Sequence, residues 1–150
     1  MKSAPSIAAT ALAIWLASAL TYVPVDWEMT DRPTTERVDL RFTNRTSDEL
    51  CISVGDWPTP GGKLNYMRGR VALVVGDDHF PIDDFDTGYC DATYAPQLED
   101  CAVHVPPGKT ITGFLTYSDF RLPERLRFSK KQLVYPLNAI VCEKKGKKQG

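Results

Sequence analysis

The sequence contains few of the residue types on which common catalytic and metal sites depend. Only two of its 150 residues are histidine, so a single chain cannot provide a three-histidine metal site. Closely spaced cysteine pairs of the Cys-x-x-Cys type are missing, which argues against a structural zinc site. The Gly-x-Ser-x-Gly pattern of serine hydrolases is missing as well. These absences favour a protein that is not an enzyme.

Excess charge is also missing, because 18 Lys and Arg nearly balance 19 Asp and Glu. The net charge of −1 excludes a uniformly basic nucleic-acid binder. The balance nevertheless conceals a split between an acidic part, residues 20–100, and a basic part, residues 101–150. A binding partner is expected to respond to this uneven distribution of charge and not to the net charge of the chain.

The strongest concentration of acidic residues lies at 77–100, which has eight carboxylates and no Lys or Arg. Closely spaced carboxylates suit Ca²⁺, so Asp83, Asp84 and Asp86 are a candidate cation site, although the segment lacks the further acidic ligands of an EF-hand loop. Ion pairs with the basic part of the chain, or simple solvation of the loop, are the alternatives.

The first 19 residues have the three parts of a secretory signal peptide. Lys2 gives a positive start, residues 7–16 are apolar, and residues 17–19 are small, as signal peptidase requires. We expect cleavage after Ala19 and a periplasmic or secreted mature protein. An uncleaved membrane anchor is the alternative, because apolar residues continue as far as Val25.

The four cysteines are an even set in a small exported chain, which favours disulfides. Four cysteines allow three pairings, and the sequence alone does not choose between them. The spacing favours Cys90 with Cys101, across the acidic loop, and Cys51 with Cys142, tying an early strand to the last one.

Short segments with strand patterns fill the chain after Arg37, and no amphipathic helix of ten residues occurs there. Val38, Leu40 and Phe42 alternate with polar residues, and the next strand is expected to form a hairpin with this one across a polar turn. One helical turn is expected at 122–126. The expected strands are 38–43, 50–54, 71–75 (a central strand), 79–82 (an edge strand), 102–105, 110–117 and one or two within 132–142.

Seven to eight short strands with turn residues between them predict an all-β fold. We expect an antiparallel Ig-like β-sandwich preceded by the signal helix, with a small barrel as the alternative. The predicted organisation is a signal peptide (1–19), an extended lead-in (20–36), a β-sandwich domain (37–142) and a basic disordered tail (143–150).

Two segments carry a family resemblance, namely VDLRFTNRT at 38–46 and VPPGKT at 105–110. They resemble bacterial exported Ig-like domains, in which a strand ending in Asn-x-Thr opens the sandwich and a Pro-Gly-Lys turn starts a later strand. Small proteinase-inhibitor domains are similar. The resemblance implies a fold and no functional residue. The same Asn-x-Thr also fits a glycosylation acceptor, but a turn explains it equally well.

The best candidate interaction surface is the Pro- and Gly-rich loop that carries Trp57 and Tyr66. The alternative is that Trp57 folds back over one end of the sandwich. His79, His104 and Asp78 offer too few ligands for a metal site, and His104 is expected to be structural in an apolar strand.

The sequence therefore predicts an exported, disulfide-stapled binding protein that acts through its loops and not by catalysis. The expected partner is a protein or a cell-envelope component, with no nucleic acid, and with a membrane only where the signal segment stays uncleaved. A Ca²⁺-binding module using the 77–100 loop is one alternative, and Ca²⁺ is the only cofactor considered. An inhibitor of an envelope or extracellular enzyme is the other.

Overall fold

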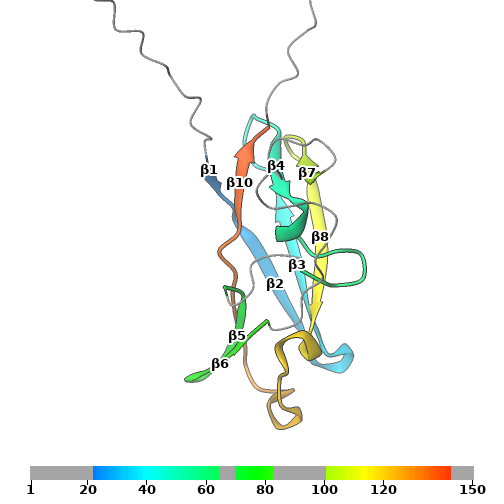
Figure 1. The fold of residues 1–150 in the computed structure, drawn as a ribbon, viewed down its shortest axis with the longest axis vertical. Helices are drawn as coiled ribbons and strands as arrows, with labels where there is room; N and C mark the ends of the chain where they lie inside the picture. The colour runs from blue at the N-terminus through cyan, green and yellow to red at the C-terminus, as the bar shows by residue number, and fades with distance from the viewer. Residues whose placement is uncertain (1–21, 65–69, 83–100, 143–150) are drawn as a thin grey trace, which may run out of the picture.

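The computed structural model describes residues 22–64, 70–82 and 101–142 (Figure 1). Within these ranges the regular structure consists of β-strands and short 3₁₀ turns, so the all-β prediction is confirmed. No helix in the described ranges is long and apolar enough to span a membrane. The strands are β1 (Tyr22–Pro24), β2 (Trp27–Arg32), β3 (Arg37–Thr43), β4 (Leu50–Ser53), β5 (Ala72–Val75), β6 (Asp78–Pro81), β7 (Ala102–Val105), β8 (Thr110–Thr116), β9 (Gln132–Val134) and β10 (Asn138–Val141).

The strands form three small antiparallel sheets. Their strand orders are β1-β10-β4-β7, β2-β3-β8 and β6-β5-β9. In Figure 1 the long strands β2, β3 and β8 run side by side, with β4, β7 and β10 toward one end of the molecule and β5 and β6 toward the other. β9 and β10 follow each other in the chain and are separated by a tight turn at Pro136, where the N–H of Leu137 donates to the carbonyl of Tyr135 at 2.8 Å.

One large hydrophobic cluster joins the three sheets. Val38, Leu40 and Phe42 of β3 are buried, while Arg41 between them is exposed and Asp39 is half-buried, so the predicted period of two is confirmed. The β3 side chains belong to the same buried cluster as side chains from the other two sheets, among them Leu50 of β4, Leu73 of β5 and Ala139 of β10. Burial of this apolar surface is the main force that holds the sheets together.

The prediction of a hairpin between β3 and β4 is wrong. β3 pairs with β2 and β8, whereas β4 pairs with β10 and β7, so the chain crosses from one sheet to another at 44–49. Asn44 sets this crossing, because its buried side chain donates to the carbonyls of Asp48 and Val105, at 2.8 and 2.7 Å. Polar turn residues are common to hairpins and crossings, which is why the sequence pattern alone misassigned the connection.

The segment expected to be only an extended lead-in supplies the two strands β1 and β2. β1 pairs with β10 and β2 pairs with β3, so the sheets already include residues 22–32, ahead of the predicted start at Arg37. The signal was present in the sequence, since Trp27 and Met29 face inward and alternate with exposed residues. Asp31 continues the inward side of β2, and a charged residue at an inward position concealed the pattern.

Most other elements agree with the prediction. β7 has the predicted bounds, β8 ends one residue earlier than predicted, and a 3₁₀ turn at Glu124–Leu126 matches the predicted helical turn. β5 is the central strand of its sheet and β6 an edge strand. β5 is, however, covered only in its first half, because Val74 and Val75 are partly exposed.

The disulfide between Cys51 and Cys142 is present, and it joins β4 to the residue that follows β10 in the same sheet. Cys101 is also disulfide-bonded. The partner predicted for it, Cys90, lies outside the described residues. The signal peptide (1–19) and the basic tail (143–150) lie outside them too.

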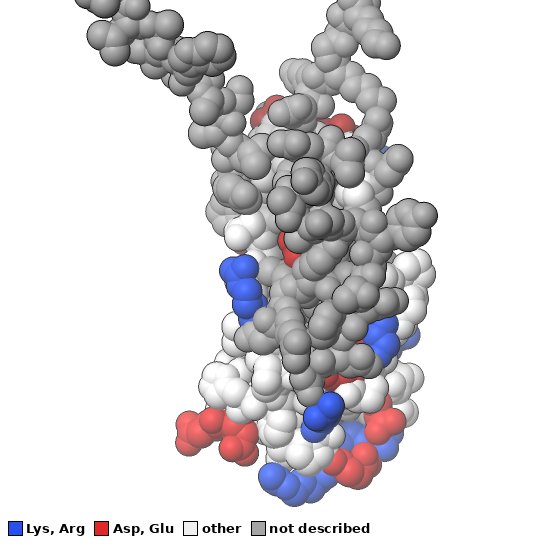
Figure 2. All heavy atoms as spheres, in the orientation of Figure 1, with Lys and Arg blue, Asp and Glu red and all other residues white. Residues whose placement is uncertain are grey.

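Among the residues that the structure describes, charged side chains from the acidic and the basic part of the sequence lie next to each other. Lys131 and Arg127, from the basic part, make ion pairs with Asp31 and Glu36 of the acidic part, at 3.0 and 3.7 Å. Figure 2 shows acidic and basic side chains interleaved at the end of the molecule where β5 and β6 lie. Ion pairing between the two parts was one of the predicted offsets, although the predicted acidic partner was the 77–100 loop.

Candidate functional site

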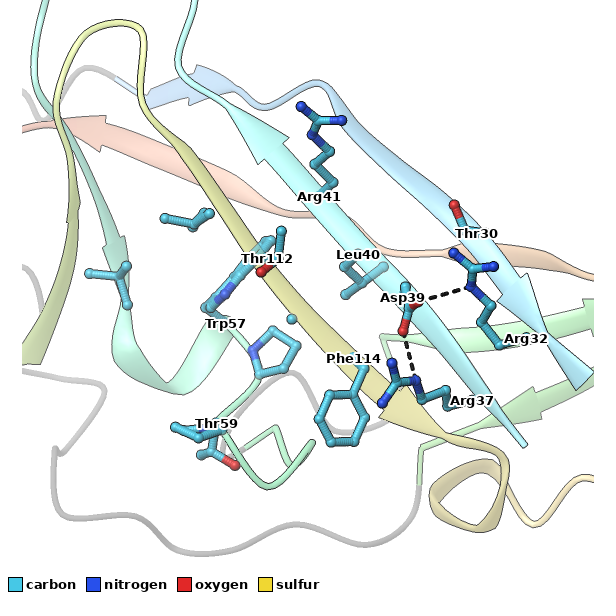
Figure 3. A pocket seen from close by; sticks show the side chains of 15 residues that line it. Thr30, Arg32, Arg37, Asp39, Leu40, Arg41, Trp57, Thr59, Thr112 and Phe114 are labelled. Atoms are coloured by element: carbon cyan, nitrogen blue, oxygen red, sulfur yellow. Dashed lines mark hydrogen bonds and ion pairs between the residues drawn. The ribbon is translucent and has the colours of Figure 1, made fainter. Parts of the chain in front are cut away.

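The most distinctive surface feature is a groove on the outer face of the β2-β3-β8 sheet, bordered by the loop that begins at Trp57 (Figure 3). Its volume is about 810 Å³. Because Val38 and Leu40 point into the core, the alternation of the strand directs Arg37, Asp39 and Arg41 outward. The groove is lined by these three side chains and by Thr30, Arg32, Leu40, Trp57, Pro58, Thr59, Pro60, Val103, Ile111, Thr112, Gly113 and Phe114.

Asp39 holds two of the three arginines of the groove. One carboxylate oxygen lies 3.1 Å from Nε of Arg32, and the other lies 2.9 Å from Nε of Arg37. Both contacts use Nε, so Asp39 leaves the terminal Nη atoms of each guanidinium for other acceptors. Those atoms form the fork with which arginine binds carboxylates and phosphates.

Arg37 is held from a second side by an aromatic ring. Its guanidinium carbon lies 4.8 Å from the centre of the Phe114 ring, a cation–π contact. The ring in turn lies against Gly62, where an added Cβ would come within 2.4 Å of the ring. Gly62 has φ +78°, a conformation that favours glycine. The loop, the ring and the arginine therefore form one stack.

Arg41 completes the cationic side of the groove in a different way. It is exposed and has no hydrogen-bond or ion-pair partner within 22–64, 70–82 or 101–142. Glu28 stands opposite it across the β2–β3 pairing, on the same outer face of the sheet, but does not line the groove. Three arginines against one aspartate give the groove a positive character.

The loop at 57–64 forms the wall of the groove along β8. It turns through the hydrogen bonds Gly62 N–H to Thr59 C=O, 2.8 Å, and Thr59 N–H to Lys63 C=O, 2.8 Å. Lys63 is anchored by an ion pair with the buried Asp119. The predicted loop is confirmed over 57–64, where it is a packed part of the fold, and its remainder at 65–69 lies outside the described residues.

Trp57 does not serve as an exposed anchor. It is 5% exposed and belongs to the main hydrophobic cluster, so the alternative reading, that it folds back over the domain, describes it better. Its indole Nε1 lies against Gly113 of β8, where an added Cβ would come within 3.3 Å. Tyr66, the other residue of the predicted interaction surface, lies outside the described residues.

The other predicted site residues are not brought together. The candidate cation ligands Asp83, Asp84 and Asp86 lie outside the described residues. His79 stands on β6 and His104 on β7, in different sheets at opposite ends of the molecule (Figure 1). His104 lies instead beside the disulfide, with Nδ1 3.5 Å from Sγ of Cys51.

Two further polar clusters have structural roles. Lys131 is buried, its Nζ donates to Asp31 at 3.0 Å, and Tyr117 donates to the same carboxylate. Burial raises the pKa of Tyr117, and its hydrogen bond to Asp31 adds to the effect. Burial also raises the pKa of Tyr135, whose hydroxyl donates to a backbone carbonyl. Every partner in these clusters is already engaged, so neither offers a reactive group.

No protein-family model, curated protein or solved structure matches the chain. Sequence reasoning named none of the groove arginines. The signal that could have found them is the outward register of β3, where Arg37 and Arg41 flank Asp39 at two-residue intervals opposite the apolar positions. In the sequence alone, such a row of charged residues is typical of an ordinary solvent-exposed strand face. Only the strand order places Phe114 beside it.

Proposed function

We propose that the chain is an extracytoplasmic binding protein without catalytic activity, and that its groove binds carboxylate groups of a partner. The partner is a protein or a component of the cell envelope. The observation that carries this proposal is the convergence of Arg32, Arg37 and Arg41 in one groove with a single aspartate. Arginine forks pair with carboxylates in a planar, two-bond geometry.

The extracytoplasmic location is supported by the Cys51–Cys142 disulfide, since such bonds persist in oxidising compartments. The apolar N-terminal segment adds sequence support. We propose that residues 1–19 are removed as a signal peptide. Intact-mass spectrometry of the exported protein should then give the mass of a chain that starts at Leu20. A mature protein that retains Met1 would favour the membrane anchor.

The Ig-like sandwich is part of the same proposal. The core that joins β3 and β8 to β4, β7 and β10 supports two facing layers. One departure from antibody domains is that the disulfide joins neighbouring strands of one sheet and not the two sheets. The fold provides the rigid outer face on which the arginines stand.

The groove is tested with two carboxylate probes, poly-glutamate for an acidic protein segment and an alginate oligomer for an acidic polysaccharide. The variant is Arg41→Ala, because Arg41 has no partner among the described residues and its loss should leave the fold intact. We expect its affinity for the bound probe to fall about tenfold, since a charged hydrogen bond contributes about 1.5–3 kcal/mol.

The matched control is Arg45→Ala, which removes an exposed arginine from the 44–49 crossing, outside the groove lining. It should change the affinity less than twofold. The probe that binds identifies the class of partner. If neither probe binds, or if the two variants weaken binding equally, the groove is not the site, because the effect then depends on total charge alone.

A further inference from the structure

A second group of chemically active side chains lies on the β1-β10-β4-β7 sheet. Cys51 of β4 stands directly opposite His104 of β7 in the strand pairing. Cys142, at the end of β10, is fixed beside them because its N–H donates to the carbonyl of Glu49, at 2.9 Å. Nδ1 of His104 lies 3.5 Å from Sγ of Cys51 and 3.7 Å from Sγ of Cys142.

The two nitrogen–sulfur distances are close to those of a tetrahedral zinc site. The sulfurs are bonded to each other and have to move to about 3.8 Å apart to bind zinc together. Zinc binds thiolate sulfur at about 2.3 Å and imidazole nitrogen at about 2.0–2.1 Å in tetrahedral geometry, which puts sulfur and nitrogen about 3.6 Å apart. The two nitrogen–sulfur distances, 3.5 and 3.7 Å, bracket that value. All three ligand atoms lie within 4.8 Å of one another.

Glu49 is the candidate for a fourth ligand. A carboxylate oxygen of Glu49 lies 3.8 Å from Nδ1 of His104. Two ligands held about 2.0–2.1 Å from a tetrahedral zinc are about 3.4 Å apart. Glu49 lies outside the group of three side chains whose ligand atoms are already close together, so its exposed side chain has to move toward the sulfurs to become the fourth ligand. His104 is 36% exposed at its side chain, whereas both cysteines are buried, so an ion reaches the sulfurs from the histidine side.

We propose that Cys51, Cys142 and His104 form a redox-controlled zinc site, with Glu49 as the fourth ligand. In the disulfide form the sulfurs are bonded to each other and bind no metal. A dithiol reductant transfers two electrons and two protons to the disulfide, giving two thiols, and is itself oxidised to a disulfide. Zn²⁺ then replaces the two thiol protons, which pass to solvent, and binds both thiolates and Nδ1.

The site joins the same two strands that the disulfide joins. Zinc would therefore replace one cross-link between β4 and β10 by another, and extend it to β7 through His104. The fold supplies the ligands from three neighbouring strands that are hydrogen-bonded to one another, so the two sulfurs can move apart while the strand order stays the same. The inference is independent of the arginine groove.

The test uses the full chain, reduced with a phosphine that is then removed without air, and titrated with Co²⁺ followed by Zn²⁺. We expect one Co²⁺ per chain with a thiolate-to-cobalt charge-transfer band, which Zn²⁺ abolishes by displacement. His104→Ala should weaken the affinity by at least about tenfold, which is the lower end of the effect of losing even an outer-shell partner. The oxidised protein should show no band.

Two controls separate this site from the other thiols and from the other histidine. His79→Ala removes an exposed histidine of β6 and should bind Co²⁺ as the wild type does. Cys51→Ser with Cys142→Ser leaves Cys90 and Cys101 in the chain and should abolish the band. Retention of the band in that double variant, or equal affinity of His104→Ala and wild type, would overturn the proposal.

The fold of the reduced chain is followed by circular dichroism in the same samples. The proposal requires that β4, β7 and β10 stay together or that Zn²⁺ brings them back. The proposal is also overturned if reduction abolishes the β-sheet signal and Zn²⁺ does not restore it. In an unfolded chain the strands no longer place His104 beside the cysteines, so metal binding would not depend on His104.

Discussion

The buried amide of Asn44 offers the sharpest test of how the fold is held at the crossing between its sheets. The residue is 0% exposed and its side chain makes four hydrogen bonds. The amide nitrogen donates to the carbonyls of Asp48 and Val105, at 2.8 and 2.7 Å. The amide oxygen accepts from the N–H and the hydroxyl of Thr46, at 2.9 and 2.8 Å. A glycan on this nitrogen is incompatible with such an arrangement.

The expected effect of Asn44→Ala follows from these four bonds. The Val105 bond is buried, and leaving a buried acceptor without its donor costs about 1–3 kcal/mol. The other three lie partly exposed, where water replaces some of the loss, and each contributes about 0.5–1 kcal/mol. We expect the free energy of unfolding to fall by about 2.5–6 kcal/mol.

Urea unfolding followed by tryptophan fluorescence measures this change, with the slope against urea unchanged if only stability is affected. Asn44→Asp keeps the shape but cannot donate to the two carbonyls and adds a buried charge, so it should destabilise at least as much. The control is Asn138→Ala, an exposed asparagine of β10, expected to change stability by less than about 0.5 kcal/mol. A loss below about 1 kcal/mol in Asn44→Ala would refute the view that this amide holds the crossing.

Three further predictions follow from other buried contacts. Gly62→Ala should lower the melting temperature more than Gly76→Ala, because both have positive φ but only Gly62 places the added Cβ against a ring, within 2.4 Å of Phe114. Lys131→Ala should cost about 3–5 kcal/mol in urea unfolding, since it leaves a carboxylate without its buried partner, whereas Lys131→Met with Asp31→Asn should recover part of the loss. Burial raises the pKa of Tyr135, so above about pH 10 only the unfolded chain releases the hydroxyl proton. The free energy of unfolding should therefore fall by up to about 1.4 kcal/mol per pH unit. A series of urea midpoints measured against pH should show a shallower fall in Tyr135→Phe.

Local patterns predicted the strands well and their neighbours poorly. The alternation at Val38, Leu40 and Phe42 fixes which face of β3 is buried, because a one-residue slip would expose all three. Nothing in that alternation says which strands lie beside β3. The pairing with β8 joins residues more than 60 positions apart, such as Phe42 and Ile111, and depends on how the whole core closes.

The same distinction explains what was found and missed in the functional sites. The Cys51–Cys142 pairing was the one that spacing favoured, because an early and a late strand are natural neighbours in a closed fold. The histidine beside it was assigned a structural role, since only the register of β4 against β7 places His104 opposite Cys51. The position of Trp57 in a loop rigidified by prolines predicts an aromatic anchor for an interface, but the core accommodates its ring.

The arginine groove shows why charge must be read from the folded surface. Arg32, Arg37 and Arg41 all come from the part of the chain in which acidic residues predominate, yet they form the positive groove. Strand alternation produces this result, because every second residue of β3 points to the same face of the sheet. Asp39 therefore lies on that face between Arg37 and Arg41 and is outnumbered by arginines there. Interactions between exposed charges fade beyond about 8–10 Å in physiological salt, so an approaching molecule senses this local cluster more strongly than the average of the segment. Recognition is therefore expected to depend on which face a strand turns outward, and the net charge of a sequence half is a poor guide to it.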